Sequence, residues 1–133
     1  PGSPAAEPEG AAEQEAGSNE DSSEHNAGSF IVKTALKYME ENYTQKITLA
    51  EVAEKTYVSQ WHLSKLLNGH TGKSFSELLN HIRIEEAKKL LKDPSLRIGD
   101  ISEEVGFMDV AHFSKVFKKL EGISANEYRN SRI

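Results

Sequence analysis

The sequence predicts an all-α protein in which two helix-turn-helix subdomains are joined by a long linker helix, with about seven helices in total. Three observations lead to this fold class. Apolar residues recur at helical spacing from residue 30 onward. Polar residues that favour helix starts precede these periodic segments. The phrase HLSK at residues 62–65 returns as HFSK at residues 112–115.

The first 28 residues differ in composition from the rest of the chain. They contain seven acidic residues and no Lys, Arg, Leu, Ile, Val or aromatic residue. Such a segment buries too little apolar surface to offset its ordering entropy, so we expect residues 1–28 to be a disordered acidic linker or partly a cloning remnant. The net charge is -5, but of the 21 acidic residues these seven leave 14 against 16 basic ones. A nucleic-acid partner is therefore compatible with the remaining domain, residues 29–133.

The first motif is predicted to span about residues 47–73, after a helix of roughly 30–42 that Ser29 would cap. Thr48 is a cap candidate for the next helix, and Glu51 stands where it would complete a capping box. Ser59 then precedes a helix that ends at Thr71-Gly72.

The linker helix is predicted to span about residues 74–93. Ser74 and Glu77 form a second capping-box pattern, and Asp93-Pro94 ends the helix because the residue before proline avoids helical backbone angles. At 1.5 Å per residue this helix would be roughly 28 Å long. Its apolar stripe consists of Phe75, Leu78, Leu79, Ile82, Ala87, Leu90 and Leu91.

The second motif is predicted to span about residues 97–122. A short helix around 99–105 ends at Gly106, and Asp109 caps a longer helix that ends at Gly122. Ser124 would cap a last short helix that runs through Tyr128.

The similarity between the two motifs extends beyond the tetrapeptides HLSK and HFSK. Residues 62–74 match residues 112–124 at an offset of 50, and residues 49–54 match residues 98–103 at an offset of 49. The one-residue slip falls in the turn. Two helix-turn-helix patterns in one register are more specific than one alone.

One side of each second helix is free of core residues. At about 100° per residue, Leu63 and Phe113 fall on the buried faces, whereas the Ser-Lys pairs point outward. Serine and lysine can bond base edges in a major groove, and apolar side chains can contact thymine methyl groups. We therefore assign base-facing positions to Trp61, Ser64, Lys65, Ala111, His112, Ser114 and Lys115. Positions that flank them are assigned to phosphate contact: Ser59, Gln60, His62, Asn68, Lys118 and Lys119.

Other site chemistries lack the residues they need. The chain has no cysteine, and its histidines form no cluster with acids at metal-ligand spacing, so we expect no metal and no cofactor. The sequence contains no nucleophile-base-acid grouping and no Gly-rich phosphate loop, so we do not expect an enzyme. Arg83 is interpreted as a structural ion pair with Glu85, Glu86 or another acid, in preference to a contact with the DNA backbone. No apolar run approaches the ~20 residues that a membrane span needs.

The segment from about Ile47 to Arg129 resembles the DNA-binding domain of AraC/XylS-type transcriptional regulators. The most specific stretch is ISEEVGFMDVAHFSKVFKKLEGISANEYR, residues 101–129, with its Val-Gly-Phe, Phe-Ser-basic, Phe-Lys-Lys and terminal Tyr-Arg elements. The first half, with Arg83 and Ala87, is similar to that family's first motif and linker helix. Departures are Ala125 in place of a proline, Leu67-Asn68 in place of Phe-Lys, and apolar Val110 and Ala111 at positions that are often polar.

The resemblance implies a bacterial, cytoplasmic protein that binds double-stranded DNA sequence-specifically through both motifs. It also implies contact with RNA polymerase and an upstream receiver or ligand-sensing domain. The sequence of the linker helix and second motif is most similar to output domains of two-component response regulators. The alternative is a helical protein-interaction module that uses the same faces to grip an acidic partner without reading DNA sequence.

Overall fold

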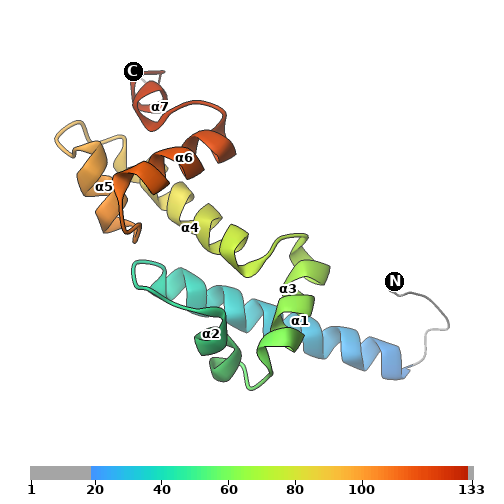
Figure 1. Ribbon diagram of the computed structural model, residues 1–133. Coiled ribbons are helices and arrows are strands. Elements are labelled where there is room, and N and C mark those ends of the chain that lie inside the picture. The colour runs from blue at the N-terminus through green and yellow to red at the C-terminus, as the bar shows by residue number, and fades with distance from the viewer. Residues whose placement is uncertain (1–18, 132–133) are drawn as a thin grey trace.

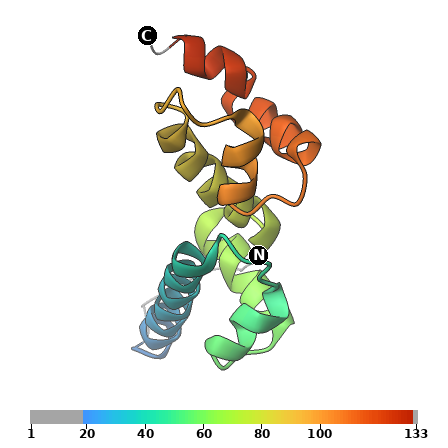
Figure 2. The same cartoon turned by 90° about the vertical axis from the view of Figure 1, so that its left-hand side faces the viewer.

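The computed structural model describes residues 19–131, which form seven helices and no strand. Figure 1 shows two lobes at the two ends of a central helix, and Figure 2 shows the same arrangement from the side. The all-α class and the double helix-turn-helix arrangement are confirmed. The helices are α1 (Asn19–Asn42), α2 (Leu49–Lys55), α3 (Gln60–Thr71), α4 (Phe75–Leu90), α5 (Ile98–Glu104), α6 (Val110–Glu121) and α7 (Ala125–Ser131).

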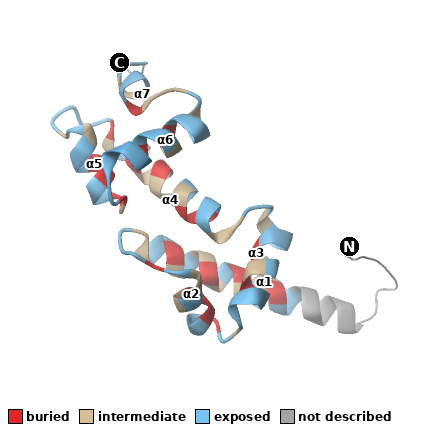
Figure 3. Cartoon of the chain, in the orientation of Figure 1, coloured by how far each residue is buried: buried red, intermediate tan, exposed pale blue. Residues whose placement is uncertain are grey.

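Each lobe has its own hydrophobic core, and α4 contributes to both (Figure 3). The first lobe consists of α1–α3 and buries Leu78 and Leu79 from the start of α4. The second lobe consists of α5–α7 and buries Ile84, Ala87 and Leu91. Ile84 was absent from the predicted stripe, because a single helical stripe cannot describe a helix that packs against different lobes along its length.

The predicted caps fix most helix starts. Thr48, Ser59 and Asp109 accept hydrogen bonds from the amide three residues ahead. Ser74 and Glu77 form a complete capping box, as do Ser124 and Glu127. The predicted box at Thr48 is only half formed, because the Glu51 carboxylate accepts a hydrogen bond from the Tyr38 hydroxyl instead. Local side-chain chemistry therefore determines these boundaries.

The start of α1 is a correction to the prediction. The helix begins at Asn19 rather than near residue 30, so Ser29 lies inside it and is not a cap. Gly28 is buried, and a Cβ atom there would lie 3.0 Å from Leu66 of α3. The segment predicted to be disordered therefore overlaps α1 at residues 19–28, whereas residues 1–18 lie outside the described part of the chain.

The linker helix is shorter than predicted. Its 16 residues end at Leu90. In the turns that follow, the Asp93 carboxylate accepts hydrogen bonds from the backbone amide and the hydroxyl of Ser95. At 1.5 Å per residue α4 is about 24 Å long.

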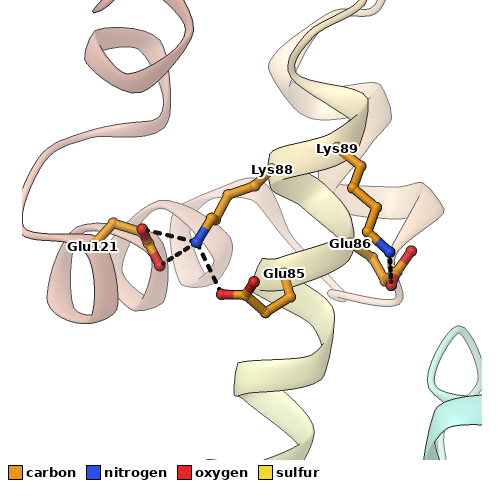
Figure 4. Close-up of polar contacts among 5 residues, drawn as sticks. All are labelled: Glu85, Glu86, Lys88, Lys89 and Glu121. Carbon is orange, nitrogen blue, oxygen red and sulfur yellow. Dashed lines mark hydrogen bonds and ion pairs between the residues drawn. The ribbon is translucent and has the colours of Figure 1, made fainter. Parts of the chain in front are cut away.

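One ion pair joins α4 to α6, and two others lie within α4 (Figure 4). Lys88 lies 2.9 Å from Glu85 on its own helix and 3.2 Å from Glu121 at the end of α6. The hydrogen bond from Lys88 to Glu85 is the main reason that the pKa of this lysine is raised, with Glu121 adding to it. Lys89 pairs with Glu86 at 2.9 Å on the neighbouring side of α4.

Within residues 19–131, no helix is both long and apolar enough to cross a membrane.

Candidate nucleic-acid interface

The turns that precede the two candidate recognition helices share one backbone geometry. In the first motif the amides of Tyr57 and Val58 bond the carbonyls of Glu54 and Ala53. In the second motif the amides of Gly106 and Phe107 bond the carbonyls of Glu103 and Ser102. Both sets form a Schellman motif, which places Tyr57 and Gly106 at the residue with positive φ. The offset of 49 therefore extends through this part of the turn.

The one-residue slip between the repeats lies at Met108. Ser59 caps α3 directly after Val58, whereas Met108 separates Phe107 from the Asp109 cap of α6. The Met108 side chain is 79% exposed. Tyr57 in the other turn is 93% exposed. Neither residue was predicted to lie at the interface, although the repeat alignment pairs Tyr57 with Gly106 and so could have indicated its unusual backbone.

The outward face of α3 agrees with the helical-wheel prediction. Trp61 is 70% exposed, and the Nζ atom of Lys65 lies 4.7 Å from the centroid of its ring. Asn68 is exposed and donates to the Ser64 carbonyl at 3.1 Å, and Ser64 itself is half-buried. The face therefore presents a cation stacked on an aromatic ring beside small polar groups.

The outward face of α6 carries smaller side chains and more lysines than the outward face of α3. Ala111, Ser114, Lys115 and Lys118 are exposed, whereas Phe113 and Phe117 are fully buried. His112 packs edge-on against the ring of Phe107 at 5.3 Å between centroids. His112, which was assigned a base-facing position, therefore also packs within its own motif.

The starts of α3 and α6 combine a side-chain cap with exposed neighbours. The Ser59 hydroxyl accepts from the His62 amide at 3.0 Å, and the Asp109 carboxylate accepts from the His112 amide at 2.7 Å. Ser59, Gln60 and His62 are exposed around the start of α3. The uncharged Ser59 cap leaves this helix end more favourable for a phosphate than the Asp109 cap leaves α6.

A cleft of about 320 Å³ lies between the start of α4 and the flank of α6. Sequence reasoning assigned two of its residues, His112 and Lys119, but not Lys73, Asn80 or His81. Glu77 also lines the cleft, and its hydrogen bonds with Ser74 hold its pKa below the usual value. Val116 and Leu120 complete the lining. The cleft lies beside the outward face of α6 and is lined by residues of both charge signs.

Among the side chains that the structure describes, residues 26–131, no group of three or more His, Asp or Glu is placed to hold a metal ion. Arg83 is structural, as expected, but its partners are not the predicted acids. It donates to the backbone carbonyls of Tyr43 and Gln45.

Comparisons with known proteins agree on one type of domain. The profile of a family described as "Helix-turn-helix domain" matches residues 52–131. The lactose operon transcription activator of Staphylococcus xylosus is 39% identical over 99 residues, which cover 74% of this chain and 36% of that protein. The chain spans about a third of the length of the curated relatives it matches.

Solved structures give the same result. The C-terminal domain of AraT, a response regulator from Geobacillus stearothermophilus, is 40% identical with a TM-score of 0.73, and the match covers 77% of this chain and 86% of that one. A transcriptional regulator with an AraC-type DNA-binding domain from Chromobacterium violaceum is 28% identical with a TM-score of 0.74, covering 80% and 96%.

Proposed function

Because this chain belongs to the AraC-type family of helix-turn-helix transcriptional regulators, we propose that its DNA-binding domain reads two short elements in successive major grooves of one duplex. The observation that carries the proposal is the repeated outward face. In α3 and again in α6, a Ser-Lys pair points away from the core, while Leu63 and Phe113 at the matching core positions are fully buried. Packing explains the buried residues but not the outward pairs.

The size of the domain is compatible with two adjacent grooves. Successive major grooves on one face of DNA are about 34 Å apart, and α4 is about 24 Å long. Figure 1 shows α3 beside the start of α4 and α6 running alongside α4, so the separation of the two helices is not the length of α4 itself. A bend in the DNA can adjust the distance between the two grooves.

The two faces differ in what they offer to a base edge. On α3, Trp61, Ser64 and Lys65 provide a stacked cation and an apolar surface for thymine methyl groups. On α6, Ala111, His112, Ser114 and Lys115 form a smaller surface. Phosphate contacts are assigned to Ser59, Gln60, His62, Asn68, Lys118 and Lys119, which are all exposed. The two elements should therefore differ in sequence.

A paired substitution tests this assignment. We expect Lys65→Ala to relax base preference in one element and Lys115→Ala in the other, each with a loss of about 1–3 kcal/mol. Lys33→Ala, on an exposed position of α1, is the matched control and should leave binding unchanged. Affinities for duplexes mutated in one element at a time are the measurement. If both lysine variants bind every duplex like the wild type, the assignment of the two faces is wrong.

The proposal extends to the protein that contains this domain. Similarity to a response-regulator C-terminal domain supports an upstream receiver domain, although a ligand-sensing domain is the other arrangement. Contact with RNA polymerase and a location in the cytoplasm, where bacterial DNA lies, belong to the same proposal, and the role is DNA binding rather than catalysis. The protein-interaction alternative is not favoured, because the matching proteins are transcription regulators.

A further inference from the structure

Arg83 lies at the middle of α4, where the two lobes meet. Its Nε atom donates to the Tyr43 carbonyl at 2.8 Å, and its Nη2 atom donates to the Gln45 carbonyl at 2.9 Å. Both carbonyls directly follow α1 and belong to the first lobe. One guanidinium group therefore holds the end of α1 through two charge-assisted hydrogen bonds.

The same guanidinium contacts the second lobe. Its central carbon lies 5.7 Å from the centroid of the Phe107 ring, within the range of a cation-π interaction. Phe107 is buried in the second core and packs edge-on against His112 of α6. A continuous set of contacts thus leads from the end of α1 to the start of the second recognition helix.

Backbone packing reinforces this junction. A Cβ atom on Gly106 would lie 2.6 Å from the Tyr43 carbonyl oxygen and 2.9 Å from Arg83 Nε, so the turn of the second motif lies directly against the end of α1. The Tyr43 side chain packs against both cores. Burial also lowers the pKa of the Arg83 guanidinium, but an arginine stays protonated at any physiological pH.

These contacts matter because the main helix-to-helix contacts either lie within one lobe or involve α4. A small bend or change of twist at the middle of that helix would alter the separation and the relative rotation of α3 and α6. We propose that Arg83 is a positioning residue that fixes this relative placement and thereby sets the spacing of the DNA elements that the domain accepts. The spacing part of the inference rests on the proposed function, whereas the placement part does not.

Arg129 provides a matched control within the same chain. It also donates to backbone carbonyls that follow a helix, those of Leu91, Asp93 and Leu96 at 3.0, 3.1 and 2.7 Å. These partners connect α7 with the end of α4, so they lie outside the junction between the lobes. Arg129→Met and Arg83→Met therefore remove the same type of hydrogen bond, but only Arg83→Met removes it from the junction.

The placement is tested on the free protein by a distance measurement between spin labels. The chain has no cysteine, so Glu54→Cys and Glu103→Cys introduce labels at matching exposed positions of α2 and α5. We expect a narrow distance distribution for the wild type and for Arg129→Met, and a broadened or shifted one for Arg83→Met. Circular dichroism confirms that each variant is folded, and Arg83→Lys, which keeps the charge but lacks the planar fork, should be intermediate. A distribution for folded Arg83→Met that equals the wild type overturns the inference.

The spacing is tested with duplexes whose two selected elements are moved apart or together by one base pair. Each step displaces an element by about 3.4 Å and rotates it by about 35° around the axis. We expect the wild type and Arg129→Met to lose roughly tenfold in affinity at one step, and Arg83→Met to lose much less than that. If Arg83→Met keeps the full spacing preference, its role in spacing is refuted. If the wild type reads no second element, the proposed function fails, while the label distances still decide the placement.

Discussion

Replacing Tyr57 with glycine should stabilise the protein, although it removes an aromatic side chain. Tyr57 has a φ angle of 62°, and the matching residue of the second motif is Gly106. A left-handed conformation costs a non-glycine residue about 1–2 kcal/mol. Glycine recovers this cost but loses about 0.4–1 kcal/mol because its unfolded state has more conformational freedom. Since the side chain is 93% exposed, little buried area is lost. The expected net gain is about 0.5 kcal/mol, or roughly 2–4 °C in Tm.

Urea unfolding followed by circular dichroism measures this difference directly. The matched control is Tyr57→Ala, which removes the same ring but keeps a Cβ atom on the left-handed backbone, so it should stay within about 0.5 kcal/mol of the wild type and gain nothing. The reciprocal change, Gly106→Ala, should destabilise by about 1–3 kcal/mol or more, because the new Cβ would lie 2.6 Å from the Tyr43 carbonyl oxygen at a φ of 105°. A Tyr57→Gly variant that is less stable than both the wild type and the alanine control would refute the reasoning.

Three further changes test other parts of the structure. Lys118→Ala should weaken binding to all DNA sequences about equally and make the salt dependence shallower by about one unit, so an effect at a single base position would contradict a phosphate role. Gly28→Leu should destabilise by about 1–3 kcal/mol in thermal unfolding, because a Cβ there already lies 3.0 Å from Leu66; an unchanged Tm would show that the start of α1 does not pack on α3. The hydrogen bonds of Ser124 lower the pKa of Glu127 in the folded state, so its carboxylate stabilises the fold at neutral pH and this contribution is lost as pH falls through the lowered pKa. The Tm difference between the wild type and Glu127→Ala should therefore shrink on acidification, and a difference that grows would contradict this assignment.

Helix starts and the outward faces could be predicted because both depend on local sequence. Ser59, Ser74 and Asp109 cap the helices that they precede, and the wheel correctly placed Trp61 and Lys65 outside the core. Capping uses groups within three residues, and an amphipathic helix shows its buried side in its own spacing.

The features that were missed depend on contacts between distant segments. Residues 19–28 contain no Leu, Ile, Val or aromatic residue, yet they belong to a helix whose Gly28 packs against Leu66. The burial of Ile84 follows from the second lobe rather than from the pattern of α4 alone. Arg83 bonds carbonyls that lie 40 and 38 residues away, which no local charge pattern indicates.

The central claim is that one chain reads two different elements in adjacent grooves, and selection of bound duplexes from a random library tests it most directly. The structure predicts enrichment of two short, dissimilar elements about one helical turn, roughly 10 base pairs, apart. Loss of one element with Lys65→Ala and of the other with Lys115→Ala would assign each to its helix. Enrichment of a single element, of two identical elements, or of none would contradict the claim.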